Sequence, residues 1–229
     1  MQTSKSFPEH IAIILDGNRR YARKKGIILE EGHRRGAKNV QKLIEWALEL
    51  SVKELTLYTF STENFKRPEK ELKYLMDNFL VNIRKLKKDK RIIEKSVRVR
   101  FGGRLAMFSK EIQEEMKEVM NITKNNNKLI VNFAMAYGGR LEVVDAVKRI
   151  IEKGLKKVDE EVIRKNLYLS DYPDLVIRPG GEKRVSNFLI WQSAYSEWYF
   201  TDKFWPEFTK KDLIEAIDDY KKRERRYGE

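Results

Sequence analysis

Asp16 is the residue whose position first suggests chemistry. It follows the apolar run at 11–15 directly and precedes Gly17, Asn18 and the basic stretch "RRYARKK". A surface ion pair would not require a carboxylate at the mouth of a buried strand. A carboxylate placed there could hold a hard cation, and the basic residues could bind the anion that shares this cation.

Four further apolar runs end in residues of the same kinds. They are followed by "STENFKR" (61–67), "GGR" (102–104), "YGGR" (137–140) and "RPGGE" (178–182). In open α/β sheets, ligands bind beyond the carboxyl ends of the strands. These ends carry glycine for close backbone approach, arginine for phosphate and acids for a cation. Together the loops predict one site for an anionic ligand.

The sequence also restricts the cofactor. It contains neither the nucleotide-binding pattern GxxxxGK[ST] nor GxGxxG after a strand. With two histidines and no cysteine, a zinc site made of His and Cys is not expected. A magnesium ion, bound by carboxylates and by phosphate oxygens of a substrate, fits the residue types that remain.

The composition is that of a globular protein. The 229 residues are 41% hydrophobic and 36% charged, which predicts a single domain over residues 1–229. No signal peptide and no run of about 18 apolar residues is present, so we expect a cytoplasmic protein that is at most peripheral to the membrane. The absence of cysteine excludes disulfides and thiol nucleophiles. The net charge of +13 favours an anionic partner: nucleic acid, an anionic membrane surface or a phosphorylated small molecule.

The elements that must position the loops alternate along the chain. β-Branched apolar runs predict strands at 11–15, 54–60, 97–101, 129–135 and 174–178. Apolar residues with a 3.6-residue period predict helices at 37–48, 72–86, 110–123, 141–154 and 159–167. This alternation predicts an α/β fold with a mainly parallel central sheet flanked by helices on both faces.

Six segments, in this order, resemble the cis-prenyltransferase family, which includes undecaprenyl diphosphate synthase. They are "HIAIILDGNRRYA", "EGHRRGA", "LTLYTFSTENFKRP", "AYGGR", "DLVIRPGGEKRVSNFLIWQSAYSEWYF" and "RERRYG", and the match runs from about residue 10 to residue 228. The resemblance implies stepwise addition of isopentenyl diphosphate, in cis, to an allylic primer, farnesyl or geranylgeranyl diphosphate. It further implies Mg²⁺, a homodimer and a hydrophobic tunnel. The product would be a medium-chain polyprenyl diphosphate such as undecaprenyl diphosphate, a glycosyl carrier lipid precursor that is delivered to the membrane.

The resemblance also assigns roles to single residues. Asp16 would be the essential aspartate and would hold magnesium together with Glu197, which would lie near the subunit boundary. Gly17, Asn18, Arg19 and Arg20 would open a helix whose free backbone N–H groups attract the primer's diphosphate. Asn64 would lie near the proton that isopentenyl diphosphate loses, either orienting the substrate or relaying the proton. Arg178, Arg184 and Ser186 would form the isopentenyl diphosphate site, and the "RYG" at 226–228 would reach a neighbouring subunit. The full set of implied substrate-binding residues is Gly17, Asn18, Arg19, Arg20, Tyr21, His33, Ser61, Thr62, Glu63, Phe65, Arg67, Arg178, Arg184, Val185 and Ser186.

The helix expected at 72–86 would cover the sheet and also form a wall of the tunnel, with Leu75, Met76 and Phe79 on one face. Two positions depart from the family pattern. Leu29 stands where many relatives carry an arginine that contacts the primer, so Arg19, Arg23 or Arg34 would have to compensate. Pro179 stands where threonine or serine is common.

Two other functions would leave different patterns in the sequence. A basic nucleic-acid-binding protein would interleave basic residues with exposed aromatic residues on one face, whereas the arginines here share loops with acids, so we expect no nucleic acid partner. A non-catalytic subunit of a heteromeric prenyltransferase would lack the first-strand aspartate and the substrate arginines. This chain has both, as well as Glu197.

Overall fold

The computed structural model describes residues 7–223, which build one six-stranded sheet with the strand order β3-β4-β2-β1-β5-β6. Every neighbouring pair of strands is parallel, which confirms the predicted α/β fold. The five predicted strands are present, and β6 was not predicted. The strands are β1 (His10–Ile14), β2 (Glu54–Ser61), β3 (Val97–Gly102), β4 (Leu129–Tyr137), β5 (Leu175–Pro179) and β6 (Glu197–Thr201).

The five helices predicted from apolar periods correspond to α2, α3, α5, α6 and α7. The helix expected to open at Gly17 is α1, while α4 and α8 were not predicted. The boundaries agree within three residues except at the start of α2, where Leu29 rather than residue 37 begins the helix because the first turns carry no apolar period. The helices are α1 (Asn18–Lys25), α2 (Leu29–Glu49), α3 (Glu69–Leu86), α4 (Lys90–Ile93), α5 (Lys110–Ile122), α6 (Gly139–Glu152), α7 (Glu160–Asn166) and α8 (Lys210–Lys222), with short 3-10 turns η1 (Thr62–Lys66), η2 (Leu105–Met107) and η3 (Trp205–Glu207).

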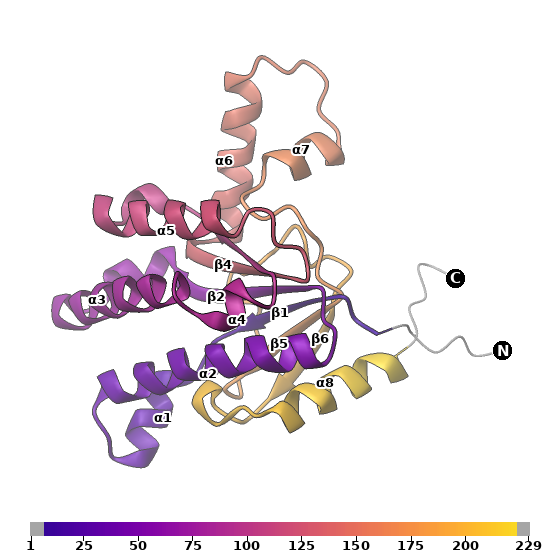
Figure 1. The fold of residues 1–229 in the computed structure, drawn as a ribbon. Helices are drawn as coiled ribbons and strands as arrows, with labels where there is room; N and C mark the ends of the chain where they lie inside the picture. The colour runs from indigo at the N-terminus through magenta and orange to yellow at the C-terminus, as the bar shows by residue number, and fades with distance from the viewer. Residues whose placement is uncertain (1–6, 224–229) are drawn as a thin grey trace.

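The two faces of the sheet are covered differently. One face packs against α2, α3, α5 and α8 and forms the main hydrophobic core. The opposite face carries a smaller cluster, which Leu169, Phe188 and Leu189 complete from irregular segments rather than from a helix. Figure 1 shows α6 and α7 projecting from the rest of the molecule. No helix within residues 7–223 is both long and apolar enough to span a bilayer.

Two glycines of α2 allow α1 to approach closely. A Cβ on Gly32 would lie 2.6 Å from the carbonyl oxygen of Asn18, and one on Gly36 would lie 2.2 Å from the side-chain oxygen of Asn18. The first residue of α1 is therefore pressed against α2. This contact places Asn18 and the start of α1 beside the carboxyl end of β1.

Candidate active site

The carboxyl ends of β1, β2 and β5 border a cavity of about 670 Å³. Many of the predicted site residues line its polar end, although they come from five separate segments of the chain. These residues are Asp16, Asn18, His33, Ser61, Glu63, Asn64, Arg67, Arg178, Arg184 and Ser186.

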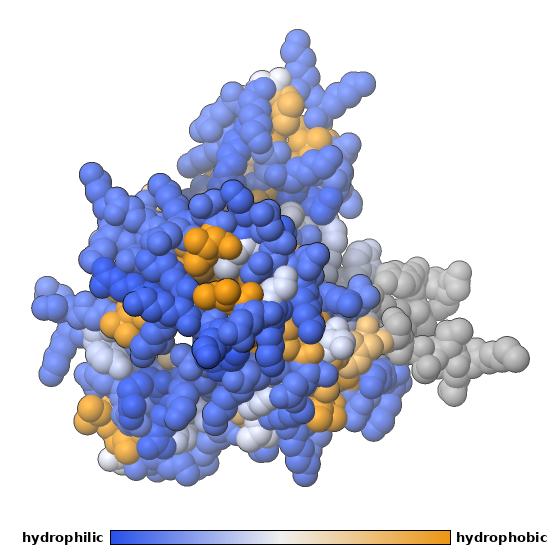
Figure 2. Space-filling view, in the orientation of Figure 1, coloured by the Kyte–Doolittle hydropathy of each residue, from blue (hydrophilic) through white to orange (hydrophobic). Residues whose placement is uncertain are grey.

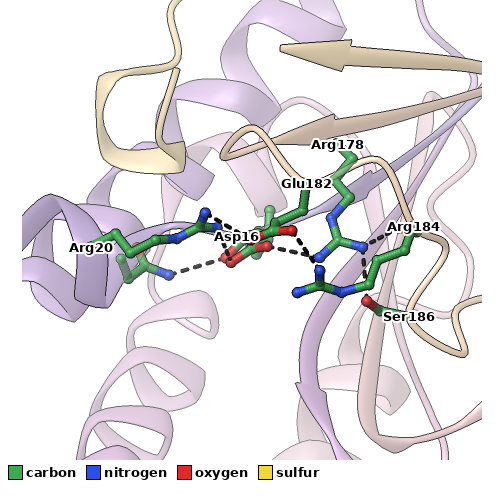
Figure 3. A network of polar contacts seen from close by, with 8 residues as sticks. Asp16, Arg20, Arg178, Glu182, Arg184 and Ser186 are labelled. Carbon is green, nitrogen blue, oxygen red and sulfur yellow. Dashed lines mark hydrogen bonds and ion pairs between the residues drawn. The ribbon is translucent and has the colours of Figure 1, made fainter. Parts of the chain in front are cut away.

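Arg178 is the most buried charged residue of this polar end, with 3% of its side chain exposed. It lies within β5, and its Nη2 donates to Asp16 Oδ2 over 2.9 Å. Its Nη1 donates to Ser186 Oγ over 2.8 Å and to the carbonyl oxygen of Arg184 (Figure 3). Its Nε is buried and has no hydrogen-bond partner among the described residues. The guanidinium is therefore held in a fixed orientation at the cavity wall.

Glu182 belongs to the site, although the sequence analysis gave it no individual role. Its carboxylate joins two of the predicted arginines, because Arg20 Nη1 lies 3.2 Å from Oε1 and Arg184 Nη1 donates to Oε2. Arg20 Nη2 also lies 3.2 Å from Asp16 Oδ1 (Figure 3). Asp16 and Glu182 thus balance the positive charge of three arginines, which are Arg20, Arg178 and Arg184. A diphosphate bound here would need positively charged groups of this kind. The acid at the end of "RPGGE" was visible in the sequence as a candidate.

Glu71, at the start of α3, is a second carboxylate that the sequence analysis missed. Its Oε1 lies 2.9 Å from Arg67 Nη1, 3.5 Å from His33 Nε2 and 3.7 Å from Arg19 Nε. Burial lowers the pKa of His33, and the charge of Arg67 lowers it further. Arg67 lies just before α3, and its four-residue spacing from Glu71 was the available signal.

Asn64 closes the turn that follows β2. Its side-chain oxygen accepts from the backbone N–H of Ser61 over 3.1 Å, and the Ser61 side chain caps the same turn. Because the oxygen is engaged, the amide offers its N–H groups to the cavity. An N–H donor can orient a diphosphate but cannot accept a proton.

The segment 186–189 has an uncommon backbone. Ser186, Asn187 and Leu189 all have positive φ angles, of 48°, 61° and 43°, a region that residues other than glycine rarely occupy. Two backbone N–H groups fix this conformation: that of Gly139 donates to Asn187 O over 2.7 Å, and that of Arg140 donates to Asn187 Oδ1 over 2.9 Å. The "YGGR" loop after β4 thereby holds the loop that carries Ser186.

Several predicted residues do not line the cavity. Arg19 and Arg20 lie outside the lining and reach the site through ion pairs, Arg19 with Glu71 and Arg20 with Asp16 and Glu182. The ring of Tyr21 is buried, and its hydroxyl accepts a hydrogen bond from Arg35 Nη1 over 2.6 Å. The ring of Phe65 contacts Phe60 and Phe108. The other predicted residues outside the lining are Gly17, Thr62 and Val185, which is 43% exposed.

Glu197 lies far from Asp16 within one chain. It is the first residue of β6 and pairs in register with Leu175, the first residue of β5, whereas Asp16 follows the carboxyl end of β1. Its side chain accepts from Arg223 Nη1 over 3.0 Å. The expectation that Asp16 and Glu197 share a metal is thus not met inside a single chain. Residues 226–228, expected to reach a neighbouring subunit, lie outside the described residues.

Beyond its polar end, the cavity has apolar walls between the sheet and α2 and α3. On α3, Leu75, Phe79, Ile83 and Leu86 line the cavity, at a spacing that places them on one face. Met76, predicted to share this face, packs against the main core and does not line the cavity. Of the three residues predicted on one face of α3, Leu75 and Phe79 therefore line the cavity and Met76 does not.

The carboxylates at the polar end of the cavity bear on magnesium binding. Within residues 7–223, no group of three or more Asp, Glu or His side chains is placed to hold a metal ion. Asp16, with 28% of its side chain exposed, lies at the polar end of the cavity. Magnesium usually binds one or two carboxylates together with substrate phosphates and waters. Asp16 fits magnesium in this mode, with a diphosphate supplying the other oxygen ligands.

Comparisons with known proteins agree with this geometry. The family model described as "Putative undecaprenyl diphosphate synthase" matches residues 14–228. The chain is 46% identical to an isoprenyl transferase of Fusobacterium nucleatum, over 98% of this chain and 97% of the relative. It is 45% identical to a tritrans,polycis-undecaprenyl-diphosphate synthase (geranylgeranyl-diphosphate specific) of Methanocaldococcus jannaschii, over 97% of this chain and 83% of the relative.

Two solved structures are similar over almost the whole chain. Lavandulyl diphosphate synthase from Lavandula x intermedia, in complex with dimethylallyl diphosphate, superposes with a TM-score of 0.92 at 31% identity and covers 97% of this chain and 99% of its own. A probable undecaprenyl diphosphate synthase from Campylobacter jejuni superposes with a TM-score of 0.83 at 34% identity, covering 98% and 100%. The chain therefore belongs to the undecaprenyl diphosphate synthase family of prenyltransferases and is an enzyme.

Proposed function

We propose that this enzyme adds isopentenyl diphosphate units, in cis, to an allylic diphosphate primer and so makes a medium-chain polyprenyl diphosphate. The observation that carries the proposal is the cavity itself. One end holds arginines, a hydroxyl and an aspartate suited to diphosphates, and the rest has apolar walls suited to a hydrocarbon chain. A single cavity can thus hold both parts of a prenyl diphosphate.

The isopentenyl diphosphate site is assigned to Arg178, Arg184 and Ser186. Arg178 is buried and oriented, so it can present fixed N–H groups to phosphate oxygens. Arg184 is 65% exposed and pairs only with Glu182 among the described residues, so it can turn toward an incoming diphosphate. The primer diphosphate is assigned to the start of α1, where free backbone N–H groups attract anions, with Arg19, Arg20, Arg67 and His33 nearby.

Asp16 is the residue proposed to hold magnesium against a diphosphate. Bound magnesium would act as a Lewis acid and neutralise charge on the departing diphosphate. Arg178 and Arg20 hold the Asp16 carboxylate in place at the cavity wall. Glu197 lies at the amino end of β6, whereas Asp16 follows the carboxyl end of β1. A role for Glu197 at the same metal would therefore require a second subunit.

Asn64 is proposed to orient isopentenyl diphosphate through its amide N–H groups. Because these groups cannot accept a proton, the basic oxygens of the released diphosphate are the proposed proton acceptor. Ser61 and Glu63 line the same part of the cavity.

The primer is proposed to be farnesyl or geranylgeranyl diphosphate. Relatives whose names specify geranylgeranyl diphosphate, from Methanopyrus kandleri and Pyrococcus furiosus, are 46% and 44% identical to this chain, which supports the longer primer as one candidate. The segment between α3 and β3 contains only the four-residue α4, and without a long insertion there we propose a product of medium length such as undecaprenyl diphosphate.

We also propose that the enzyme is a cytoplasmic homodimer that delivers its product to the membrane. Helix α6 supports a subunit contact, because Val144, Val147 and Ile151 are exposed at a spacing that forms one apolar stripe.

The test is turnover by the purified chain. Radiolabelled isopentenyl diphosphate should be incorporated in the presence of magnesium and either primer, and the product lengths should be read by chromatography. Single condensation, or no incorporation with any allylic primer from dimethylallyl to geranylgeranyl diphosphate, would contradict the proposal. Abolition of turnover by a chelator and its recovery with Mg²⁺ would support the metal.

A further inference from the structure

The segment that joins α3 to β3 carries a dense group of lysines. Residues 85–95 read KLKKDKRIIEK. Lys85, Lys88, Lys90 and Lys95 are exposed, and none of them is ion-paired with another residue of the described chain, 7–223. We call these four the lysine rim. The segment also contains one exposed acid, Glu94, so the exposed side chains keep an excess of positive charge.

The lysine rim is presented from a fixed backbone. Ile92 is 1% exposed and anchors α4 in the core, and Asn126 Nδ2 donates to its carbonyl oxygen over 3.2 Å. Arg91 lies 2.8 Å from Glu45 of α2 and also pairs with Asp89. The next residue, Ile93, points outward and is 57% exposed. Figure 2 shows a small hydrophobic patch over α4 in a largely hydrophilic face.

The cavity reaches the surface beside this rim. Asn78, Asn82 and Lys85 follow one another along α3 at helical spacing, and all three line the cavity. Lys85 is at the same time an exposed residue, and Asp89 lines the cavity next to it. The cavity that begins at Asp16 therefore extends along α3 to the base of the lysine rim.

We infer that the lysine rim docks this enzyme on a bilayer that contains anionic lipids, with Ile93 in the headgroup region and the opening beside Lys85 facing the lipid. The inference rests on the proposed function, since a polyprenyl chain is the ligand that would pass from such an opening into a bilayer. Positive side chains and one exposed apolar residue on a fixed surface are complementary to anionic headgroups over an apolar interior. Each lysine near such a surface strengthens binding about fivefold.

The first test is sedimentation of the full chain with vesicles, in the absence of substrate. Vesicles of phosphatidylglycerol and phosphatidylcholine should bind the protein, vesicles of phosphatidylcholine alone should bind it weakly, and added salt should weaken the binding. The double variant Lys88→Gln/Lys90→Gln should lower the affinity for the anionic vesicles roughly 25-fold. The matched control, Lys156→Gln/Lys157→Gln, removes two exposed lysines from the loop between α6 and α7 and should change it less than threefold.

A second test reports orientation and uses the absence of cysteine from the chain. Ile93→Cys and Val158→Cys, exposed by 57% and 53% in the native chain, each give a single site for an environment-sensitive fluorophore. Binding to anionic vesicles should shift the emission of the label at position 93 to the blue and leave that at position 158 unchanged.

Equal effects of the two lysine pairs, or equal emission shifts at the two labels, would overturn the inference. If the Lys88/Lys90 variant lost affinity for a DNA duplex and not for vesicles, the rim would be a nucleic acid site and the lipid docking would be wrong. Vesicle binding needs no catalysis, so its failure would leave the prenyltransferase assay unaffected. An inactive wild-type enzyme that still bound anionic vesicles through the rim would contradict only the proposed function.

Discussion

Replacing Asp16 with asparagine should separate two roles that the structure gives to this carboxylate. Asp16 is proposed to hold magnesium at the diphosphate, and it is also the acidic partner of the buried Arg178 guanidinium. Asparagine keeps the shape of the side chain and removes its charge. We therefore expect turnover to be abolished and stability to fall at the same time.

The size of the stability loss follows from the contacts of Arg178. Its guanidinium is 3% exposed and would lose one charge-assisted hydrogen bond of 2.9 Å, while it keeps Ser186 Oγ and the carbonyl oxygen of Arg184 as acceptors. Such a bond contributes about 1.5–3 kcal/mol. For a protein of this size the melting temperature should fall by roughly 3–12 °C.

Asp145→Asn provides the matched control. Asp145 is 15% exposed and accepts two hydrogen bonds from Arg104, of 2.8 and 2.9 Å, away from the cavity. This variant should lose a similar amount of stability and keep its turnover. Both proteins would be compared by isopentenyl diphosphate incorporation and by thermal melts. Turnover of the Asp16→Asn variant within about twofold of wild type would refute the metal role, and an unchanged melting temperature would refute the ion-pair argument.

The remaining predictions concern the second diphosphate site, the apolar wall and the pH dependence of stability. Arg184→Ala should raise KM for isopentenyl diphosphate roughly 10- to 150-fold, which is more than the rise in KM for the primer. The melting temperature should stay nearly unchanged because the side chain is exposed. An effect on KM for the primer alone would contradict the assignment. Leu75→Trp should shorten the products and Phe79→Ala should lengthen them, because both residues line the cavity. Met76 lies outside the lining, so Met76→Ala should lower the melting temperature without changing product length. Identical product lengths in all three variants would exclude the tunnel role. Burial lowers the pKa of His10 to about 4, so the unfolded chain binds more protons there and the free energy of unfolding should fall as the pH drops from 6.5 towards 4. Burial, reinforced by the charge of Asp171, raises the pKa of Glu54 to about 7, so the folded chain binds more protons there and the free energy of unfolding should rise as the pH drops from 7 towards 4.5; His10→Gln should remove the first slope and Glu54→Gln the second in denaturant titrations.

Much of the fold was predictable because β-branched runs and helical periods are local signals. The strands before Asp16, Ser61 and Arg178 were placed within about a residue, and so their loops met at one edge of a parallel sheet as expected. Helix α1 was expected only through the family resemblance, because its sequence, NRRYARKK, buries only Tyr21 and Ala22 and shows no extended apolar period. Helix α8 has such a period, with Leu213, Ala216, Ile217 and Tyr220 buried, and could have been predicted.

The site was less predictable because its remaining parts depend on tertiary contacts. Glu71 gathers residues from α1, α2 and the turn after β2, and no local pattern shows that these segments meet. The position of Glu197 depends on which end of β6 it occupies and on the register between β5 and β6. A resemblance in sequence could name this residue but could not show that it lies away from Asp16 in the same chain.

The backbone of segment 186–189 has a thermodynamic consequence for substrate binding. Its positive φ angles are held by hydrogen bonds within the chain, from the backbone N–H groups of Gly139 and Arg140 to the carbonyl and side-chain oxygens of Asn187. The conformational entropy of ordering this loop is therefore lost when the chain folds and does not oppose the binding of a diphosphate. Calorimetry of pyrophosphate binding to the wild type should accordingly show a smaller entropic cost than binding to an Asn187→Gly variant, in which the same loop would have to be ordered by the ligand.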